Sequence, residues 1–384
     1  MAKISVGFSE SLDPVEAAAE AAGRAREGLE GRCDLCLVFA SGPHLSMAKW
    51  LLSEVHDALE PVHLIGCGAG GTLAAGREFE EGPALVVWAA SLPDAEVSTV
   101  HVTAEREGED FRLLGLPAEL SPDAVIILAD PYSFPSEVLL RTLEASRPGT
   151  PVLGGLASAA YAGGSVLLRD GDVHSDGAVG VFVSGMQVLP CVSQGAAPVG
   201  PEMTVTASEG NLLGQLASRP AMERLGEVIA ALPEREQALA ANGVLLGIVI
   251  DENRPEHERG DFLVRPIIGA DRDSGSIAIG ERVRVGQTVR LHVRDAASAD
   301  EDLRAALRDQ VQALGPEGAA GALLFTCNGR GSHMFEVPDH DASAVEDALG
   351  VPSAGFFCAG EIGPVGGRNF LHGFTATMAV FPAA

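Results

Sequence analysis

One pattern of strands and a helix occurs three times along this chain of 384 residues, and it restricts the folds open to the chain. Each copy consists of a short apolar strand, an amphipathic helix, a second strand that runs into a glycine-rich turn, and a third strand. The copies span residues 35–91, 124–185 and 322–381. Repeated units of this kind bury one another's apolar faces. The sequence therefore predicts an α/β fold built from repeated β-α-β-β units, with mixed sheets covered by helices.

The spacing within the copies is also similar. The first strand and the glycine turn are separated by comparable lengths in the pairs Ser41 to Gly66, Asp130 to Gly154 and Cys327 to Gly355. A right-handed crossover places the helix of each parallel pair on one face of its sheet. We therefore predict that the first strands of the first two copies share a sheet, with helices 45–59 and 136–147 on the same side.

The segment between the second and third copies differs from the repeats. Residues 261–295 predict antiparallel hairpins, because Val289, Leu291 and Val293 alternate with polar residues in the manner of a half-buried strand. A joint rich in Gly, Pro and Ala precedes this segment at residues 194–205. The sequence thus predicts two domains, residues 1–200 and residues 201–384.

Charge and hydropathy exclude several classes of function. Lys and Arg number 26 against 53 Asp and Glu, which gives a net charge of −27. Such a surface repels nucleic-acid phosphates and anionic lipid, so neither nucleic acid nor a membrane is expected as a partner. The apolar runs are far shorter than the roughly 20 residues that span a bilayer, and residues 1–20 do not resemble a secretion signal. Six cysteines in a chain of this length do not suggest a disulfide framework, so we expect a cytoplasmic protein.

Four glycines at positions 66, 68, 70 and 71 resemble a phosphate-binding loop only superficially. A dinucleotide fingerprint needs a helix after the glycines and an acidic residue about 20 positions later, whereas another strand follows here. The lysine of a nucleotide triphosphate loop is also absent from this segment. We expect these glycines to serve a tight turn and a close approach of the backbone, and we predict no cofactor.

The residues most suggestive of a site lie near the C-terminus. Cys327, Asn328 and Arg330 lie at the end of the strand that begins at residue 322. Three further polar residues lie in two apolar, glycine-rich segments that follow it. The candidate ligand-binding residues are Cys327, Asn328, Arg330, Glu361, His372 and Thr375. If the three strands of this copy are neighbours in one sheet, these side chains meet at one edge.

Several interpretations of this group remain open. Glu361 is costly to bury without a partner, so it either forms an internal ion pair with Arg330 or meets the cation of a ligand. Arg330 could hold a ligand carboxylate with two parallel hydrogen bonds. A ligand that carries both a carboxylate for Arg330 and a cation for Glu361 is a zwitterion. Alternatively, Cys327 could act as the nucleophile of a hydrolase, with His372 as base. Residues 332–341 contain two histidines and two aspartates, but the spacing fits helix capping better than a metal site, and no metal is predicted.

With these residues in view, the chain resembles the FIST family, named for F-box and intracellular signal transduction proteins. The N-terminal half resembles the FIST N domain through "HLIGCGAGG", "PDAVIILADPYSFPSEVLL" and "TPVLGGLASA". The C-terminal half resembles the FIST C domain through "EGNLLGQLASRPAMERL", "DFLVRPIIGAD", "GALLFTCNGRG", "AGFFCAGEIGPVGG" and "LHGFTATMAVF". The resemblance implies a sensory module for small ligands, with amino acids or related metabolites suggested, that relays a signal.

Residues and resemblance together predict a small-molecule-binding protein that is not an enzyme. Its ligand is expected to be amino-acid-like, and its output would pass through a separate downstream signalling protein. Two alternatives stay open: a cysteine-dependent hydrolase or amidotransferase that uses Cys327, and a protein-interaction scaffold.

Overall fold

The computed structural model describes residues 1–383 except residue 109, residues 118–120 and residues 160–164. The chain divides into two compact units. The large unit consists of Met1–Val192 together with Leu303–Ala384, and the small unit consists of Ser193–Asp302. The sequence division into residues 1–200 and 201–384 is continuous along the chain, whereas the last part of the chain returns to the large unit.

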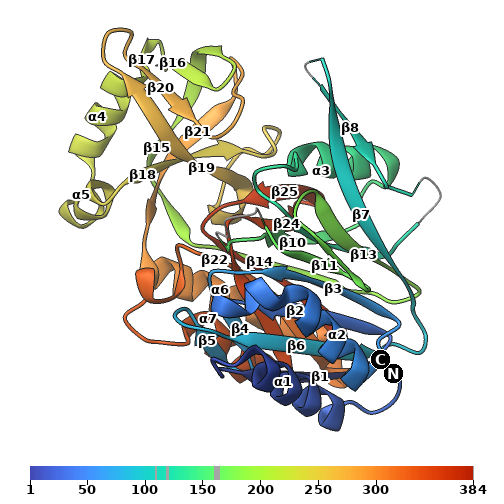
Figure 1. Cartoon of the computed structure of the whole chain (residues 1–384). Helices are drawn as coiled ribbons and strands as arrows, with labels where there is room; N and C mark the ends of the chain where they lie inside the picture. Colours follow the sequence, from blue (N-terminus) through green and yellow to red (C-terminus); the bar gives the residue numbers. More distant parts are fainter. Residues whose placement is uncertain (109, 118–120, 160–164, 384) are drawn as a thin grey trace. The chain divides into compact units, whose positions relative to one another are not determined.

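The three predicted copies are confirmed as three β-α-β-β units, all within the large unit (Figure 1). In each unit the first and second strands are parallel neighbours, and the third strand lies antiparallel on the other side of the first. The first unit contains β2 (Leu35–Ala40), α2 (Ala48–Leu59), β3 (His63–Gly68) and β6 (Leu85–Ser91). The second contains β9 (Ala124–Ala129), α3 (Ser136–Ser146), β10 (Val152–Leu156) and β13 (Ala178–Ser184). The third contains β22 (Ala319–Cys327), α7 (His340–Leu349), β23 (Ser353–Cys358) and β26 (Thr375–Pro382).

Each unit gives a hairpin to the sheet of another unit. The first unit's hairpin, β4 (Thr72–Ala74) and β5 (Arg77–Phe79), pairs with β23 of the third unit. The second unit's hairpin, β11 (Leu167–Arg169) and β12 (Asp172–His174), pairs with β3 of the first. The third unit's hairpin, β24 (Glu361–Val365) and β25 (Arg368–His372), pairs with β10 of the second. The exchange therefore runs once around the three units and closes on itself.

One further strand flanks the third strand of every unit. These strands are β1 (Lys3–Ser9) beside β6, β7 (Glu96–Glu107) beside β13, and β14 (Leu189–Gln194) beside β26. Strand β8 (Asp110–Leu114) extends β7 as a hairpin. The remaining helices are α1 (Pro14–Gly28) and α6 (Ala296–Leu314), with short 3₁₀ helices η1 (Gly42–Met47), η3 (Gly315–Glu317) and η4 (Gly331–His333). The repeat thus extends to the order of strands across three whole sheets.

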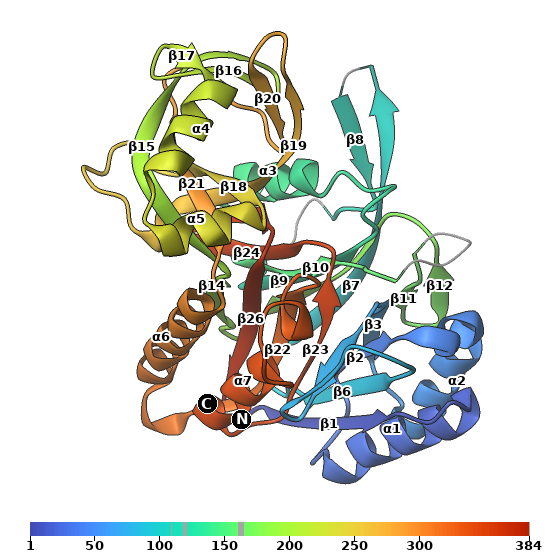
Figure 2. The same cartoon turned by 90° about the vertical axis from the view of Figure 1, so that its left-hand side faces the viewer.

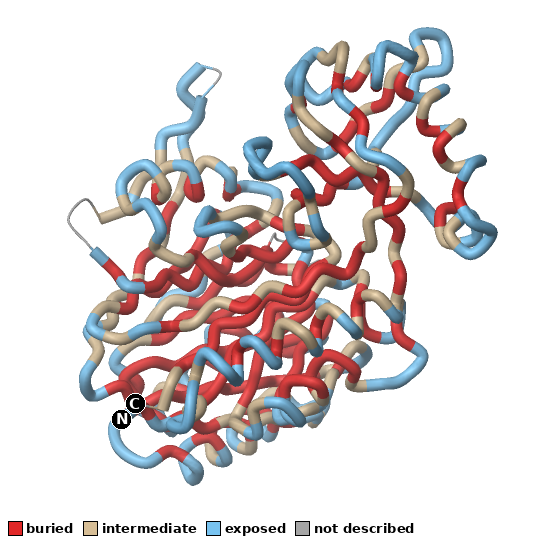
Figure 3. Tube along the Cα trace, turned by 180° about the vertical axis from the view of Figure 1, so that it is seen from behind, coloured by how far each residue is buried: buried red, intermediate tan, exposed pale blue. Residues whose placement is uncertain are grey.

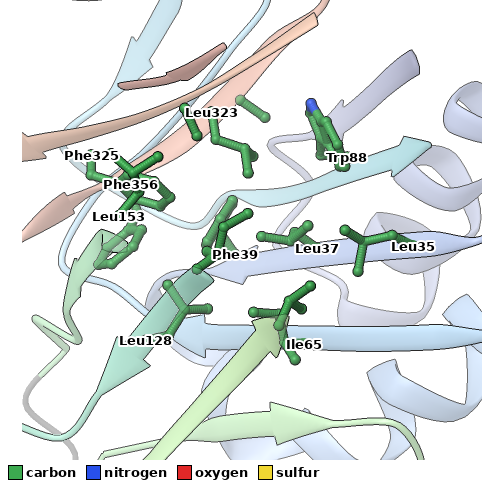
Figure 4. Close-up of a cluster of buried hydrophobic side chains, with 14 of the residues drawn as sticks. Leu35, Leu37, Phe39, Ile65, Trp88, Leu128, Leu153, Leu323, Phe325 and Phe356 are labelled. Atoms are coloured by element: carbon green, nitrogen blue, oxygen red, sulfur yellow. The ribbon is translucent and has the colours of Figure 1, made fainter. Parts of the chain in front are cut away.

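The three sheets enclose one central core and carry their helices on the outside. Phe39 of the first sheet, Leu128 of the second and Phe325 of the third belong to the same buried cluster (Figure 4). Separate clusters join α1 and α2 to the first sheet, α3 to the second, and α6 and α7 to the third. The strands are accordingly buried on both faces, which explains why their sequences are apolar throughout rather than alternating (Figure 3). Among the described helices, none is both long enough and apolar enough to cross a membrane.

The expectation that the first two units share one sheet is wrong. Strand β2 lies in the sheet of order β1-β6-β2-β3-β11-β12, and β9 lies in the sheet of order β25-β24-β10-β9-β13-β7-β8. Helices α2 and α3 therefore cover different sheets (Figure 2). The physical reason is that each unit already forms a parallel pair covered by its own helix, and its open edge is completed by a donated hairpin.

A glycine at one equivalent strand position permits the parallel pair in every unit. Gly66, Gly154 and Gly355 are aligned with Val38, Ile127 and Leu324 of the first strands. A Cβ at these glycines would lie 2.2, 1.9 and 1.7 Å from the carbonyl oxygens of those partners. The sequence analysis predicted a close backbone approach near Gly66, and this is confirmed. All three glycines lie within strands β3, β10 and β23 rather than in the turns that follow them.

The small unit is a separate antiparallel structure with its own core. Its strands are β15 (Ala196–Glu209), β16 (Leu212–Leu216), β17 (Arg219–Pro220), β18 (Val244–Val249), β19 (Phe262–Asp271), β20 (Ser276–Ile279) and β21 (Thr288–Arg294). Helices α4 (Ala221–Ala231) and α5 (Glu234–Ala241) and the 3₁₀ helix η2 (Arg259–Asp261) complete it. The predicted antiparallel hairpins are confirmed, and Val289, Leu291 and Val293 point into the core. The additional pairing of β15 with β16 closes the sheet on itself.

Replacing a strand glycine should therefore be far more harmful than replacing a helical one. We expect Gly355→Ala to lower the free energy of unfolding by more than about 3 kcal/mol, because backbone and not a side-chain end must move. As a control, Gly23→Ala in α1 meets no atom within 4 Å and should stabilise the protein by about 0.5–1 kcal/mol. Urea denaturation of both variants measures this, and equal unfolding free energies would contradict the close approach.

Candidate functional site

The candidate residues gather where the parallel strands of the third unit end. Cys327 is the last residue of β22, Glu361 is the first of β24, and Thr375 is the first of β26. Ligands of open α/β sheets commonly bind beyond the carboxyl ends of the parallel strands. Asn328 and Ala359 beside the group are exposed, so the buried side chains lie just below the surface.

Glu361 is fully buried, and only one of its two carboxyl oxygens is bonded. Oε2 accepts hydrogen bonds from the Thr375 backbone N–H at 3.1 Å and from the Thr375 hydroxyl at 2.8 Å. Oε1 has no hydrogen-bond partner among the described residues. Burial raises the pKa of Glu361 to about 8, and the bonds from Thr375 only partly oppose it. The group is therefore mostly a neutral carboxylic acid at pH 7.

Cys327 lies beside Glu361 and is protonated as well. Its sulfur accepts a hydrogen bond from the Gly329 backbone N–H at 3.4 Å. A second bond from the Phe374 backbone N–H also favours the thiolate. Burial and the nearby Glu361 carboxyl raise the pKa of Cys327 to about 12. Phe374 has φ of 66°, a left-handed conformation that is unusual for a bulky residue and is often found at functional sites.

Arg330 is fully buried and makes a forked ion pair with Asp341. Nε donates to Oδ2 at 2.6 Å, and Nη2 donates to Oδ1 at 2.8 Å. Burial alone would raise the pKa of Asp341, but the Arg330 guanidinium holds it well below the ordinary range. Arg330 Nη1 has no hydrogen-bond partner in the part of the chain that the structure describes. The guanidinium also lies 5.2 Å from the centre of the Phe335 ring.

Two details of the sequence interpretation are therefore corrected. Glu361 and Arg330 are close enough to influence each other's charge, but their hydrogen bonds go to Thr375 and Asp341 instead. The internal Glu361–Arg330 ion pair is not formed. The two parallel hydrogen bonds that Arg330 was expected to give to a ligand carboxylate go to Asp341 instead. Only Nη1 of its guanidinium is left to bond a ligand.

Sequence analysis missed the contribution of the first unit to this site. The hairpin β4–β5 carries Glu78, whose Oε1 accepts hydrogen bonds from the backbone N–H groups of Asp341 and Ala342, at 2.8 and 3.0 Å. Glu78 thus caps α7, a role that we had given to the aspartates around it. Burial and the charge of Asp341 raise the pKa of Glu78 to about 7. Glu80 of the same segment accepts bonds from the Ser332 N–H and hydroxyl, both at 2.8 Å.

Asn328 and His372, the two remaining candidate residues, each form a hydrogen bond to a main-chain carbonyl oxygen. The Asn328 backbone N–H donates to the Cys358 carbonyl oxygen at 2.9 Å, which ties the turn after β22 to the end of β23. His372 lies opposite Glu361 in the β24–β25 ladder, and its Nε2 donates to the Gly363 carbonyl oxygen at 2.9 Å. The structure thus brings Cys327, Glu361, His372 and Thr375 together, with Arg330 next to them and Asn328 at the surface.

The raised pKa of Glu361 makes stability depend on pH in a defined direction. In the unfolded chain the carboxyl ionises near pH 4.5, whereas in the folded chain it stays protonated up to about pH 8. Its stabilising contribution is therefore complete below about pH 4.5 and is lost as the pH rises toward 8, by up to about 1.4 kcal/mol per pH unit. Glu361→Gln keeps the neutral shape and should remove this slope.

Urea denaturation at pH 5.5, 6.5 and 7.5 measures the difference between the wild type and Glu361→Gln. We expect the wild type to lose stability relative to the variant across this series. Glu27→Gln, at an exposed position on α1, serves as the control and should give a curve parallel to the wild type. A Glu361→Gln curve parallel to the wild type would mean that Glu361 is ionised in the folded protein.

Breaking the buried ion pair should cost much more than breaking an exposed one. We expect Arg330→Met to lower the free energy of unfolding by about 3–5 kcal/mol, because the buried Asp341 charge loses its guanidinium and keeps only the bonds from Thr326 and His340. Arg112→Met removes an exposed partner of Glu105 and should cost about 0–1 kcal/mol. The double variant Arg330→Met/Asp341→Leu should recover part of the loss in denaturation experiments. A double variant no more stable than Arg330→Met would argue against an uncompensated charge as the cause.

Comparison with known proteins shows which family the chain resembles. Residues 34–219 match the FIST N domain, and residues 221–364 match the FIST C domain. "Uncharacterized protein Rv0628c" of Mycobacterium tuberculosis strain H37Rv is 46% identical over 383 residues, covering 99% of each chain. "Uncharacterized protein Mb0898c" of Mycobacterium bovis is 45% identical over 383 residues, covering 99% of this chain and 98% of that protein. FIST domains are associated with signal transduction and the sensing of small ligands, and this chain belongs to the FIST family.

Proposed function

We propose that this chain is a cytoplasmic sensory protein that binds an amino acid or a related small metabolite at the strand ends of the third unit. It acts without chemical conversion of the ligand and passes the signal to a separate protein. The observation that carries this proposal is the pair of buried polar atoms left unbonded at one site, Glu361 Oε1 and Arg330 Nη1. Other buried side chains of the described residues, such as His44 and Trp88, also have an unbonded atom. Glu361 and Arg330 differ from these because they act on each other's charge and offer an acceptor and a charged donor in one group of residues, which supports a ligand there.

The two atoms differ in what they can bind. Arg330 Nη1 is a charged donor and suits one carboxylate oxygen, and Glu361 Oε1 can accept from an ammonium group. An α-amino acid carries both groups within a few bonds of each other. The main-chain amides of Gly329 and Phe374 bond to Cys327. The Thr375 hydroxyl bonds to Glu361 Oε2, so these donors hold the neighbouring side chains in place. The remaining donor and acceptor, Arg330 Nη1 and Glu361 Oε1, would orient a small zwitterion, whereas a nucleotide would require more donors for its phosphates.

Ionisation of Glu361 would couple binding to pH. The carboxyl is mostly neutral below about pH 8, because burial disfavours its charge. An ammonium ion beside it favours the carboxylate, so the ligand would bind with release of one proton. Each pH unit below 8 would then weaken binding by about tenfold, which corresponds to about 1.4 kcal/mol.

The alternatives receive less support from the same residues. A catalytic cysteine needs a depressed pKa, and the pKa of Cys327 is about 12. The Nε2 atom of His372, the proposed base, donates to the Gly363 main-chain oxygen, so this nitrogen is not available to accept a proton. A scaffold needs no ligand, and the acceptor of Glu361 beside the charged donor of Arg330 favours a binding protein over it.

Thermal shift against a panel of amino acids, short peptides and nucleotides tests the proposal at pH 7.5. We expect hits among the amino acids, and a ligand at 100 times its Kd should add about 2.7 kcal/mol of stability. Glu361→Gln should bind the same ligand at least tenfold more weakly, and its affinity should not change between pH 6.5 and 7.5. The Glu27→Gln control should match the wild type in both respects.

The competing outcomes are distinct. Hits confined to nucleotides would reject the zwitterion and favour the glycine-rich segment at residues 66–71 as the site. Rapid labelling of Cys327 by iodoacetamide at pH 7 would reject a protonated thiol and favour the hydrolase. Amino acids that bind equally well to Glu361→Gln would place the site elsewhere in the chain.

A further inference from the structure

A cavity of about 320 Å³ lies in the large unit at the opposite ends of its repeated strands. Three third strands, β6, β13 and β26, end beside it, and the flanking strands β1, β7 and β14 begin there. The cavity is lined by Met1, Ala2, Leu92, Pro93, Asp94, Ala95, Gly185, Met186, Gln187, Leu189, Ala313, Leu314 and Pro382. It is separate from the group around Glu361, none of whose members lines it.

The repeat itself produces this cavity. Two connections of four residues each, 92–95 between β6 and β7 and 185–188 between β13 and β14, turn at equivalent places. Gly185 has φ of 77°, and a Cβ there would lie 2.9 Å from the Asp94 carbonyl oxygen, so the two turns approach each other closely. These two turns, together with Met1, Leu314 and Pro382, surround the space of the cavity.

The cavity is lined mainly by apolar side chains, with one acidic side chain, Asp94, among them. Most of the lining side chains are aliphatic or methionine, and the cavity is within the size range of small-ligand sites. Asp94 supplies a carboxylate, and Leu314 lies at the C-terminal end of α6, where the helix dipole favours a cation. The terminal ammonium of Met1 lies 3.3 Å from Asp94 Oδ2, so this carboxylate already holds an ammonium group.

That ammonium pair is easily exchanged. The side chains of Met1 and Asp94 are 76% and 83% exposed, and exposed ion pairs contribute little to stability. An ammonium on a ligand with an alkyl chain would replace it at Asp94 and would bury the chain among Leu92, Met186 and Leu189. The volume holds on the order of ten water-sized groups, which suits a short chain.

We propose that this cavity is a second ligand site of the protein, and that it takes a short alkylammonium ion. The ammonium group lies at Asp94 and the C-terminal end of α6, and the alkyl chain fills the space between the turns 92–95 and 185–188. A carboxylate of the same length is excluded by Asp94 and by the net charge of −27.

The test follows the methyl group of Met186 by NMR in the full chain labelled with ¹³C-methyl methionine. Hexylammonium, hexanol and hexanoate are the probes, and Met378, which is fully buried away from the cavity, is the internal reference. We expect hexylammonium to shift the Met186 signal with saturation, hexanol to bind about two- to fivefold more weakly, and hexanoate to have no effect.

Variants separate this site from the one proposed above. Asp94→Asn should weaken hexylammonium by about two- to fivefold and leave hexanol unchanged, whereas Asp57→Asn on the exposed face of α2 should change neither. Ala313→Trp, at an exposed helical position, should block both probes without disturbing the fold. Glu361→Gln should leave the Met186 response intact. A Met186 signal that does not move, equal binding of hexylammonium to Asp94→Asn, or loss of the response in Glu361→Gln would overturn the proposal.

Discussion

In each repeat of the large unit, the backbones of the two parallel strands approach each other too closely for a side chain at one position. At Gly66, Gly154 and Gly355 there is no room for a Cβ, because the carbonyl oxygen of the neighbouring strand already occupies its place. This contact fixes the register of the pair, and the register decides where each second strand ends. The donated hairpin of each unit follows the end of its second strand. The direction in which the hairpin leaves toward another sheet therefore depends on the register of the parallel pair. The three sheets can enclose one core only because the three contacts are alike.

The same register shows why one copy, rather than all three, carries the candidate site. Counting three residues on from the partners of the glycines gives Ser41, Asp130 and Cys327, each at the end of a first strand. Ser41 and Asp130 are buried, and their polar atoms are bonded: the Ser41 hydroxyl donates to the Gly82 carbonyl oxygen at 3.1 Å, and Asp130 accepts from the Ser133 N–H at 2.7 Å. The third unit differs because it adds a buried guanidinium and a buried carboxyl beside its thiol. The repeat places a residue at the end of each first strand, and the residues of the third unit give that place its thiol and its buried guanidinium and carboxyl.

Much of this could be predicted from the sequence, for identifiable reasons. The repeat was evident because strands buried on both faces are apolar throughout and because the glycines recur at similar distances from the strand ends. Glu361 stood out because a carboxylate is rare in an apolar, glycine-rich segment. The partners could not be predicted in the same way. Asp341 is close to Arg330 in sequence but sits at the start of α7, where an aspartate normally suggests a cap.

Glu78 was beyond sequence reasoning for a different reason. It is 263 residues from Asp341, and it reaches α7 only because the hairpin β4–β5 crosses to the sheet of the third unit. A pattern of strands and helices does not specify which sheet receives a hairpin. The exchange has a consequence for synthesis on the ribosome. The second sheet needs the β24–β25 hairpin, which ends at His372, and the third sheet has no parallel pair until the last part of the chain is made. The first-made hairpin, β4–β5, must therefore wait unpaired until β23 has been made, and the large unit closes only after β26 has followed.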